Sequence, residues 1–152
     1  MISTQDVEEA QDSWAKGIIQ IGQAPTWEES KALAISFVQA HYLVEGGTLL
    51  FCPTRAARQQ FRKTLKDAVS YFVGGDSDHG EDHGFALERW NSVRFENAGV
   101  VIGSDNALAM GNYFFARSDG PEVKVEYSFV YVRDSSGRLV IQLHHSAMPF
   151  GS

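Results

Sequence analysis

The chain has 152 residues, of which 43% are hydrophobic and 12% aromatic, and a net charge of −6 at pH 7. This length suits a single domain, residues 1–152, with its own hydrophobic core, and the composition excludes a disordered protein. The acidic balance argues against a nucleic-acid partner, because such partners need a basic surface. The densest basic stretch, residues 55–66, has helical periodicity and is interpreted as the solvated face of a helix.

The chain contains one cysteine, Cys52, so no disulfide can form within it. Residues 1–11 are acidic and polar, unlike a secretory signal peptide. No apolar run is long enough to cross a membrane. We therefore expect a cytoplasmic protein with no membrane partner.

Helical patterns occupy the first part of the chain. Residues 4–22 carry apolar side chains at steps of three and four, which predict an amphipathic helix. Thr26 and Glu29 form a capping-box pattern that predicts a second helix, ending at residues 45–47. The predicted buried face of this second helix carries Leu33, Phe37, Ala40 and Val44.

A short apolar strand is predicted at residues 48–52, because Pro53 stops it. Thr54 is then placed to cap a third helix, which ends at the glycines 74–75. The polar, glycine-rich stretch 74–84 is predicted to be a loop.

The second half of the chain has strand character. Strands are predicted at residues 92–102, with a bulge at 97–99, and at 108–117, 123–133 and 139–147. Helices followed by an antiparallel meander indicate an α+β fold, with N-terminal helices packed on one face of a curved antiparallel β-sheet.

The last predicted strand contains two adjacent histidines followed by a serine. Because strand side chains alternate between faces, His144 and Ser146 share one face and His145 and Ala147 share the other. The two histidines therefore cannot ligate one metal together unless a bulge re-aims one of them, and both can be purely structural. The second face also carries Leu139, Ile141 and Leu143. That pattern predicts that His145 and Ala147 point inward, whereas a bulge near the strand end would turn Ser146 inward instead.

Other candidate sites are weaker. The acidic stretch 76–84 offers possible metal ligands, but its glycines disfavour a helix that would align them, so we interpret it as a solvated loop. Thr54 either caps a helix or offers a hydroxyl to a small anion at the helix N-terminus. Tyr71 is either a core aromatic or a donor to a pocket. Cys52 is interpreted as buried and inert. No nucleophile motif, P-loop or dinucleotide-binding motif is present.

A series of sequence blocks extends from about Trp27 to Pro149: F-x-P-T, AAxxQFR, SYFVGG, EDxGFAL, ALAMGNYFF, KVEYSFVYVRDSSGRL and LHHSAMP. In this order the blocks resemble the iota-class carbonic anhydrases. That family is similar to the association domain of calcium/calmodulin-dependent kinase II and belongs to the NTF2-like cone folds. The resemblance implies a single NTF2-like domain.

The resemblance also implies a pocket in which Thr, Tyr and Ser hydroxyls hold bicarbonate beside histidine. The candidate catalytic residues are then Thr54, Tyr71, Ser146, His145 and His144. The family pattern HHSS reads HHSA here. If the working serine is the first, it is Ser146 and is retained. If it is the second, Ala147 lacks the hydroxyl.

The expected function is reversible hydration of carbon dioxide to bicarbonate, with no metal and no cofactor. One alternative is a non-catalytic NTF2-like dimerisation or small-ligand-binding module, which Ala147 favours. A second is an isomerase or dehydratase, ranked lower because the strands offer few inward carboxylates. Val130 and Val132 lie on the sheet face that the helices cannot cover, and so predict a homodimer.

Overall fold

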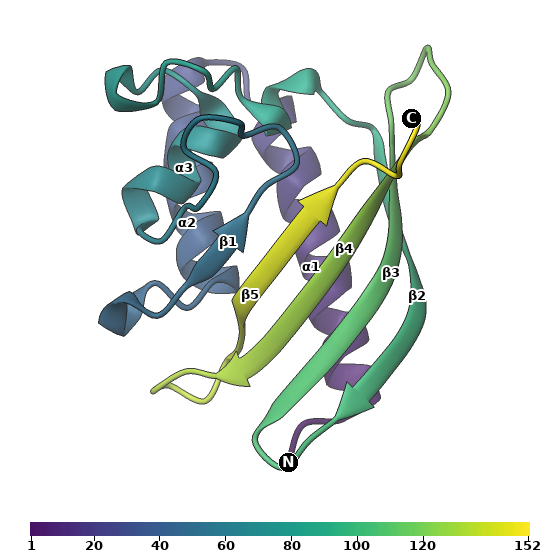
Figure 1. The fold of residues 1–152 in the computed structure, drawn as a ribbon. Coiled ribbons are helices and arrows are strands. Elements are labelled where there is room, and N and C mark those ends of the chain that lie inside the picture. Colours follow the sequence, from purple (N-terminus) through teal and green to yellow (C-terminus); the bar gives the residue numbers. More distant parts are fainter.

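A computed structural model describes residues 1–152 as one mixed sheet covered on one face by helices (Figure 1). The helices are α1 (Thr4–Gln23), α2 (Trp27–His41) and α3 (Leu65–Val73), and the strands are β1 (Leu50–Cys52), β2 (Ser92–Ile102), β3 (Asn106–Ala116), β4 (Val123–Arg133) and β5 (Leu139–Ala147). Short 3-10 turns lie at Glu45–Gly47, Ser77–His79 and Phe85–Glu88. The predicted α+β fold is confirmed.

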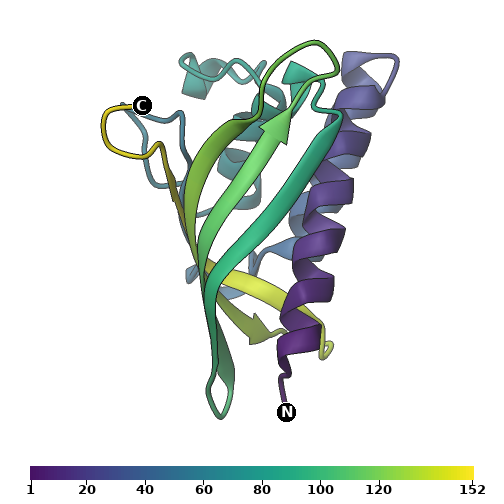
Figure 2. The ribbon, with the colours of Figure 1, turned by 90° about the vertical axis from the view of Figure 1, so that its right-hand side faces the viewer.

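The strand order is β1-β5-β4-β3-β2. Strands β2 to β5 pair antiparallel, and the short β1 adds a parallel edge beside β5, which the sequence did not indicate. The sheet is curved, and α1 lies along it next to β2 (Figure 2). The core lies between this curved face and the helices, and the inward side chains of β4 alternate as predicted. No helix is long and apolar enough to cross a membrane.

Helix α2 is shorter than predicted and buries a different face. It ends at His41, and Leu33 is 41% exposed, while Ala34, Phe37 and Val38 are buried. The C-terminal cap at Tyr42 is extended, so its side chain turns into the core. The predicted face was right at Phe37 and wrong at Leu33 and Ala40, which are exposed, and Val44 lies beyond the end of the helix.

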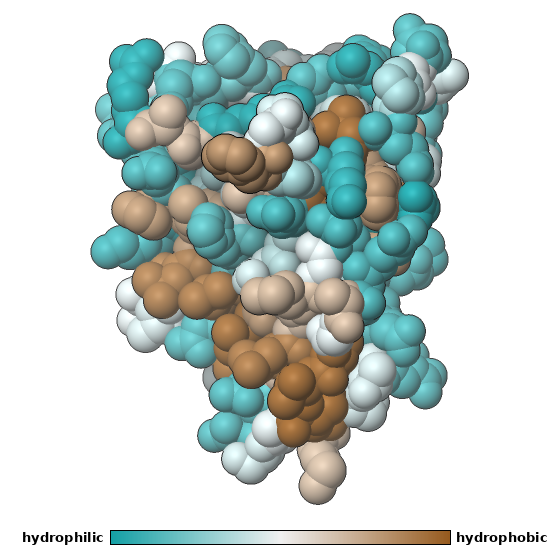
Figure 3. Space-filling model, turned by 45° about the vertical axis from the view of Figure 1, so that its right-hand side comes forward, coloured by the Kyte–Doolittle hydropathy of each residue, from teal (hydrophilic) through white to brown (hydrophobic).

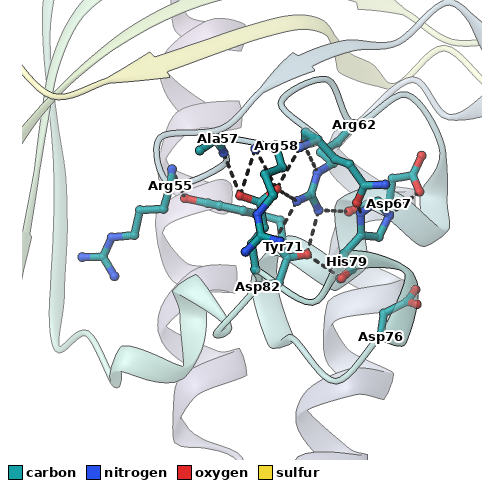
Figure 4. A network of polar contacts seen from close by, with 12 residues as sticks. Arg55, Ala57, Arg58, Arg62, Asp67, Tyr71, Asp76, His79 and Asp82 are labelled. Carbon is teal, nitrogen blue, oxygen red and sulfur yellow. Dashed lines mark hydrogen bonds and ion pairs between the residues drawn. The ribbon is translucent and has the colours of Figure 1, made fainter.

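The third helix begins at Leu65, capped by Thr64, and not at Thr54. The segment between β1 and α3 has no regular structure because long-range contacts hold it (Figure 4). The carboxylate of Glu81 accepts the backbone N–H groups of residues 57–59. Arg62, predicted to be solvated, has a fully buried side chain that pairs with the buried Asp82 at 2.7 Å.

The acidic stretch 76–84 is therefore attached to the domain and is not a freely solvated loop. Asp82 also accepts a hydrogen bond from Ser70 on α3. The buried His79 contacts Asp67 at 2.7 Å, from Nε2 to Oδ1. These contacts explain why the stretch lacks a sequence signal for order: its partners lie on another segment.

Strand β5 contains a bulge that reverses the predicted facing of its last residues. Tyr131 pairs with Ile141 and Val130 pairs with Leu143, so Gln142 is an extra residue in β5. A bulge shifts the alternation by one residue. In consequence His144 and Ser146 point inward and are buried, whereas His145 is exposed on the outer face.

A candidate active site of linked hydroxyl groups

A small cavity lies between the inner face of the sheet and the helices. Its polar lining consists of Thr54, Tyr71, Tyr113, His144 and Ser146. The remaining lining is mostly aromatic and apolar, from Trp14, Phe51, Pro53, Phe72 and Phe85. The volume is about 10 Å³, close to the smallest space that holds one water. The cavity is thus sized for a very small molecule among hydroxyl groups.

Ser146 links residues from three strand segments. Its Oγ lies 2.5 Å from Oγ1 of Thr54 and also contacts the hydroxyl of Tyr113. Thr54 reaches this position because β1 runs parallel to β5, with Cys52 opposite His145. The irregular chain after Pro53 leaves Thr54 free to face Ser146, since it caps no helix.

His144 lies at the base of the cavity and is 2% exposed. Its Nδ1 is 2.9 Å from the hydroxyl of Tyr42, and its Nε2 is 3.0 Å from the hydroxyl of Tyr113. Burial, with a smaller contribution from His145, lowers the pKa of His144 to about 3. The imidazole is therefore neutral at physiological pH and carries one N–H.

We infer the direction of the hydrogen-bond chain by letting each hydroxyl group and the imidazole donate once. Trp14, which can only donate, gives its Nε1–H to the Tyr42 hydroxyl at 3.0 Å. Tyr42 then donates to Nδ1 of His144, which places the imidazole proton on Nε2, facing Tyr113.

The same direction continues to the cavity. Tyr113 accepts from His144 and donates to Ser146, and Ser146 donates to Thr54. The Thr54 proton is the one left at the end of the chain. Neutral groups arranged in this way present a positioned hydroxyl donor to whatever occupies the cavity.

Tyr71 completes the polar wall from helix α3. Its hydroxyl accepts the backbone N–H of Arg55 at 3.3 Å, and its ring stacks on Phe85. Burial raises the pKa of Tyr71 to about 12, so the group stays a neutral hydroxyl. Figure 4 shows Tyr71 between Arg55 and the Arg62–Asp82 pair.

The structure brings four of the candidate residues together: Thr54, Tyr71, His144 and Ser146. It does not bring His145 to them, because the β5 bulge places that side chain outside. Position 147 lies on the same outer side, opposite the exposed Glu126, so a serine there would not enter the cavity. Ala147, the one position at which HHSA differs from HHSS, therefore lies outside the pocket.

Sequence reasoning missed Tyr113, Tyr42 and Trp14. Tyr113 and Trp14 follow the same apolar periodicity as neighbouring core aromatics, so only their hydroxyl or indole partners distinguish them. No group of three or more His, Cys, Asp or Glu side chains is arranged to hold a metal ion. The chemistry available at the cavity is that of neutral hydroxyls and one neutral imidazole.

Comparisons with known proteins identify the family and the fold of this chain. A family model described as metal-independent carbonic anhydrase matches residues 5–148. A protein named metal-independent carbonic anhydrase from Nostoc sp. is 34% identical over 98% of this chain and 75% of its own length. A crystal structure of an iota-carbonic anhydrase from a cyanobacterium, complexed with bicarbonate, has a TM-score of 0.94 and 33% identity. The match covers 99% of this chain and 94% of the chain in that structure.

More distant structures share the fold alone. An association domain similar to that of calcium/calmodulin-dependent kinase II, from Xanthomonas campestris, has a TM-score of 0.65 at 17% identity. The match covers 100% of this chain and 91% of the chain in that structure. Helices on one face of a curved sheet, with a pocket between them, define an NTF2-like domain. Within that class, the chain belongs to the metal-independent carbonic anhydrase family.

Proposed function

We propose that this protein catalyses the reversible hydration of carbon dioxide to bicarbonate without a metal, in the cavity lined by Thr54, Tyr71, His144 and Ser146. The observation that carries the proposal is the chain of hydrogen-bond contacts that links Trp14 to the Thr54 hydroxyl. Membership of the family supports the reaction, and the hydroxyl groups that line the cavity can donate hydrogen bonds to a small anion.

In this mechanism a water molecule attacks the carbon of carbon dioxide, and negative charge develops on the substrate oxygens. Preorganised hydroxyl donors in a water-poor site stabilise such charge without reorganising. Thr54 donates to one oxygen, and the hydroxyl of Tyr71 lines the same cavity close to the attacking water. Ser146 acts by holding the Thr54 hydroxyl in its direction.

The non-catalytic alternative loses the observation that favoured it, because Ala147 lies on the outer face of the sheet. An isomerase or dehydratase gains no support either, since none of the residues that line the cavity is a carboxylate.

Stopped-flow hydration of carbon dioxide tests the proposal directly. We expect the wild-type protein to exceed the buffer rate and to keep that rate after treatment with a chelator. Thr54→Val keeps the side-chain volume and removes the hydroxyl, so it is expected to lose most of the activity. A wild-type rate equal to that of buffer would refute the carbonic anhydrase activity, and loss of activity with chelator would refute its independence from metal.

We also propose that the protein forms a homodimer through the outer face of the sheet. An apolar row crosses this face in register, one residue from each strand: Leu50, Leu143, Val130, Leu108 and Val101. Leu50, Leu108 and Val101 are 53%, 45% and 61% exposed. Hydrophobic residues gather on the lower part of this face (Figure 3). A continuous patch of this kind is typical of an interaction surface, and a second copy is its commonest partner.

A further inference from the structure

A second, larger cavity adjoins the candidate active site. It has a volume of about 370 Å³ and is lined by Arg55, Tyr71, Glu81, Asp82, His83, Gly84, Phe85, Leu87 and Glu88. Tyr71 and Phe85 line both this outer cavity and the small inner one. These two side chains therefore form the wall between the inner cavity and the outer one.

The proposed reaction requires a group that accepts the released proton beyond this wall. Hydration of carbon dioxide by water yields bicarbonate and one proton in every turnover. His144 cannot carry that proton to solvent, because it is 2% exposed and both of its ring nitrogens are occupied by tyrosine hydroxyls. The remaining polar groups of the inner cavity are hydroxyls, which can pass a proton on but do not retain it.

Most polar groups of the outer cavity are unsuited to receive the proton. Three backbone N–H groups hold the pKa of Glu81 at about 2. Asp82 is fully buried against Arg62. Glu88 binds two arginines, Arg55 through one carboxylate oxygen and Arg117 through the other, both at 2.6 Å. Each carboxylate in the outer cavity is therefore already neutralised by a partner.

His83 is different. It is exposed to solvent, lines the outer cavity and forms no side-chain hydrogen bond or ion pair in the domain. Imidazole is the side chain that accepts and releases protons near neutral pH. The other histidines lie elsewhere: His41 contacts Ser13, His79 contacts Asp67, and His145 is on the outer face of the sheet.

We propose that His83 accepts the proton released by carbon dioxide hydration and delivers it to solvent buffer. This inference rests on the proposed function. The proton leaves the attacking water as the carbon–oxygen bond forms, crosses the wall at the Tyr71 hydroxyl and reaches His83 through water in the outer cavity. Tyr71 accepts one proton as it donates another, so it remains neutral throughout. The proton then passes from His83 to a buffer base, and the imidazole returns to its starting state.

The test is His83→Ala, assayed by stopped-flow hydration in dilute buffer and again with added imidazole. The proton is transferred as the carbon–oxygen bond forms, so we expect kcat and kcat/KM to fall together by about 10-fold or more. Added imidazole is expected to restore kcat, because a small base can enter the outer cavity in place of the missing side chain. A chloride salt at the same ionic strength is expected not to restore it.

The matched control is His145→Ala, the same substitution on the outer face of the sheet, which is expected to keep kcat. Circular dichroism and Tm confirm that both variants are folded. An unchanged kcat for His83→Ala in dilute buffer would overturn the inference, and so would a loss that imidazole does not restore. An inactive wild-type protein would instead overturn the proposed function, so the two failures are distinguishable.

Discussion

The hydroxyl of Thr54 lies 2.5 Å from that of Ser146, although 92 residues separate them in the chain. Parallel pairing of β1 with β5 brings the two segments side by side, and the bulge at Gln142 turns Ser146 toward Thr54. The contact depends on both features at once. It joins the proposed substrate donor to the hydrogen-bond chain that sets its direction.

Removal of the Ser146 hydroxyl should abolish this arrangement with little cost to the fold. We expect Ser146→Ala to lower kcat/KM about 100-fold, because the Thr54 donor remains but loses the contact that orients it. The matched control is Ala147→Ser, which adds a hydroxyl on the outer face and is expected to leave kcat/KM unchanged. A rate gain in Ala147→Ser would show that the second serine position reaches the pocket.

The direction of the chain should depend on Tyr42, which does not line the cavity. Tyr42→Phe leaves Nδ1 of His144 without its donor, so the imidazole proton can move to that nitrogen and the chain can reverse. We expect a loss of about 10-fold in kcat with a KM that changes little, because orientation rather than binding is lost. Nitrogen-15 chemical shifts of the His144 ring check the change of tautomer, which a purely structural role would not produce.

Acidification should destabilise the protein through His144. Its pKa is about 3 in the folded state and about 6.5 when exposed, so the unfolded chain binds more protons between these values. The stabilising contribution is therefore complete above about pH 6.5 and is lost progressively as the pH falls toward 3. The slope reaches about 1.4 kcal/mol per pH unit for one proton.

Urea denaturation measured at several pH values between about 5 and 6.5 isolates this effect from most carboxylates. Glu81 loses its stabilising contribution only as the pH falls from 4.5 toward about 2. Burial also lowers the pKa of His41, which adds a smaller slope of the same sign. We expect His144→Gln to flatten the dependence in this window, and an unchanged slope would contradict the neutral, buried state of His144.

The ion pair of Arg62 with Asp82 should be the most sensitive point of the segment before α3. Arg62→Met leaves a fully buried carboxylate without its partner, a change that costs about 3–5 kcal/mol in the free energy of unfolding. Lys66→Met removes a solvent-exposed partner of Asp78 and is expected to change little. Chemical denaturation compares the two, and equal small effects would contradict a structural role for the buried pair.

The apolar row on the outer face should control association. We expect the wild-type protein to elute at the mass of a dimer and Leu108→Lys to elute as a monomer, measured by light scattering after size exclusion. Phe61→Lys is the control, since Phe61 is exposed at 64% outside the row. A wild-type monomer over a wide concentration range would contradict the proposed dimer.

The alternation of residues along the sequence was sufficient to predict most of the sheet. Strand alternation predicted β4 and β5 with their true ends, and the bulge near Asn97 was visible because Gly99 interrupts the pattern. These features depend on neighbours in sequence. The bulge at Gln142 carries no such mark, since glutamine is an ordinary strand residue, and so the inward face of β5 was predicted wrongly.

The segment after Thr54 was predicted wrongly from its local sequence pattern. Residues 55–66 have helical periodicity, yet the Glu81 carboxylate binds their backbone N–H groups and Asp82 draws Arg62 inward. The free energy of these distant contacts outweighs helix propensity. Sequence placed four residues of the cavity by family resemblance, but the Tyr113 link required knowledge of which strands are adjacent.

The Gln142 bulge has a consequence for how much variation the terminal strand can tolerate. Without it, β5 would slip by one residue and turn His145 and Ala147 inward. A strand that read HHSS at positions 144–147 would present one histidine and one serine to the pocket in either register. In HHSA only one register supplies the hydroxyl. In this chain a slip of β5 by one residue would therefore remove the only serine hydroxyl that this strand gives to the pocket.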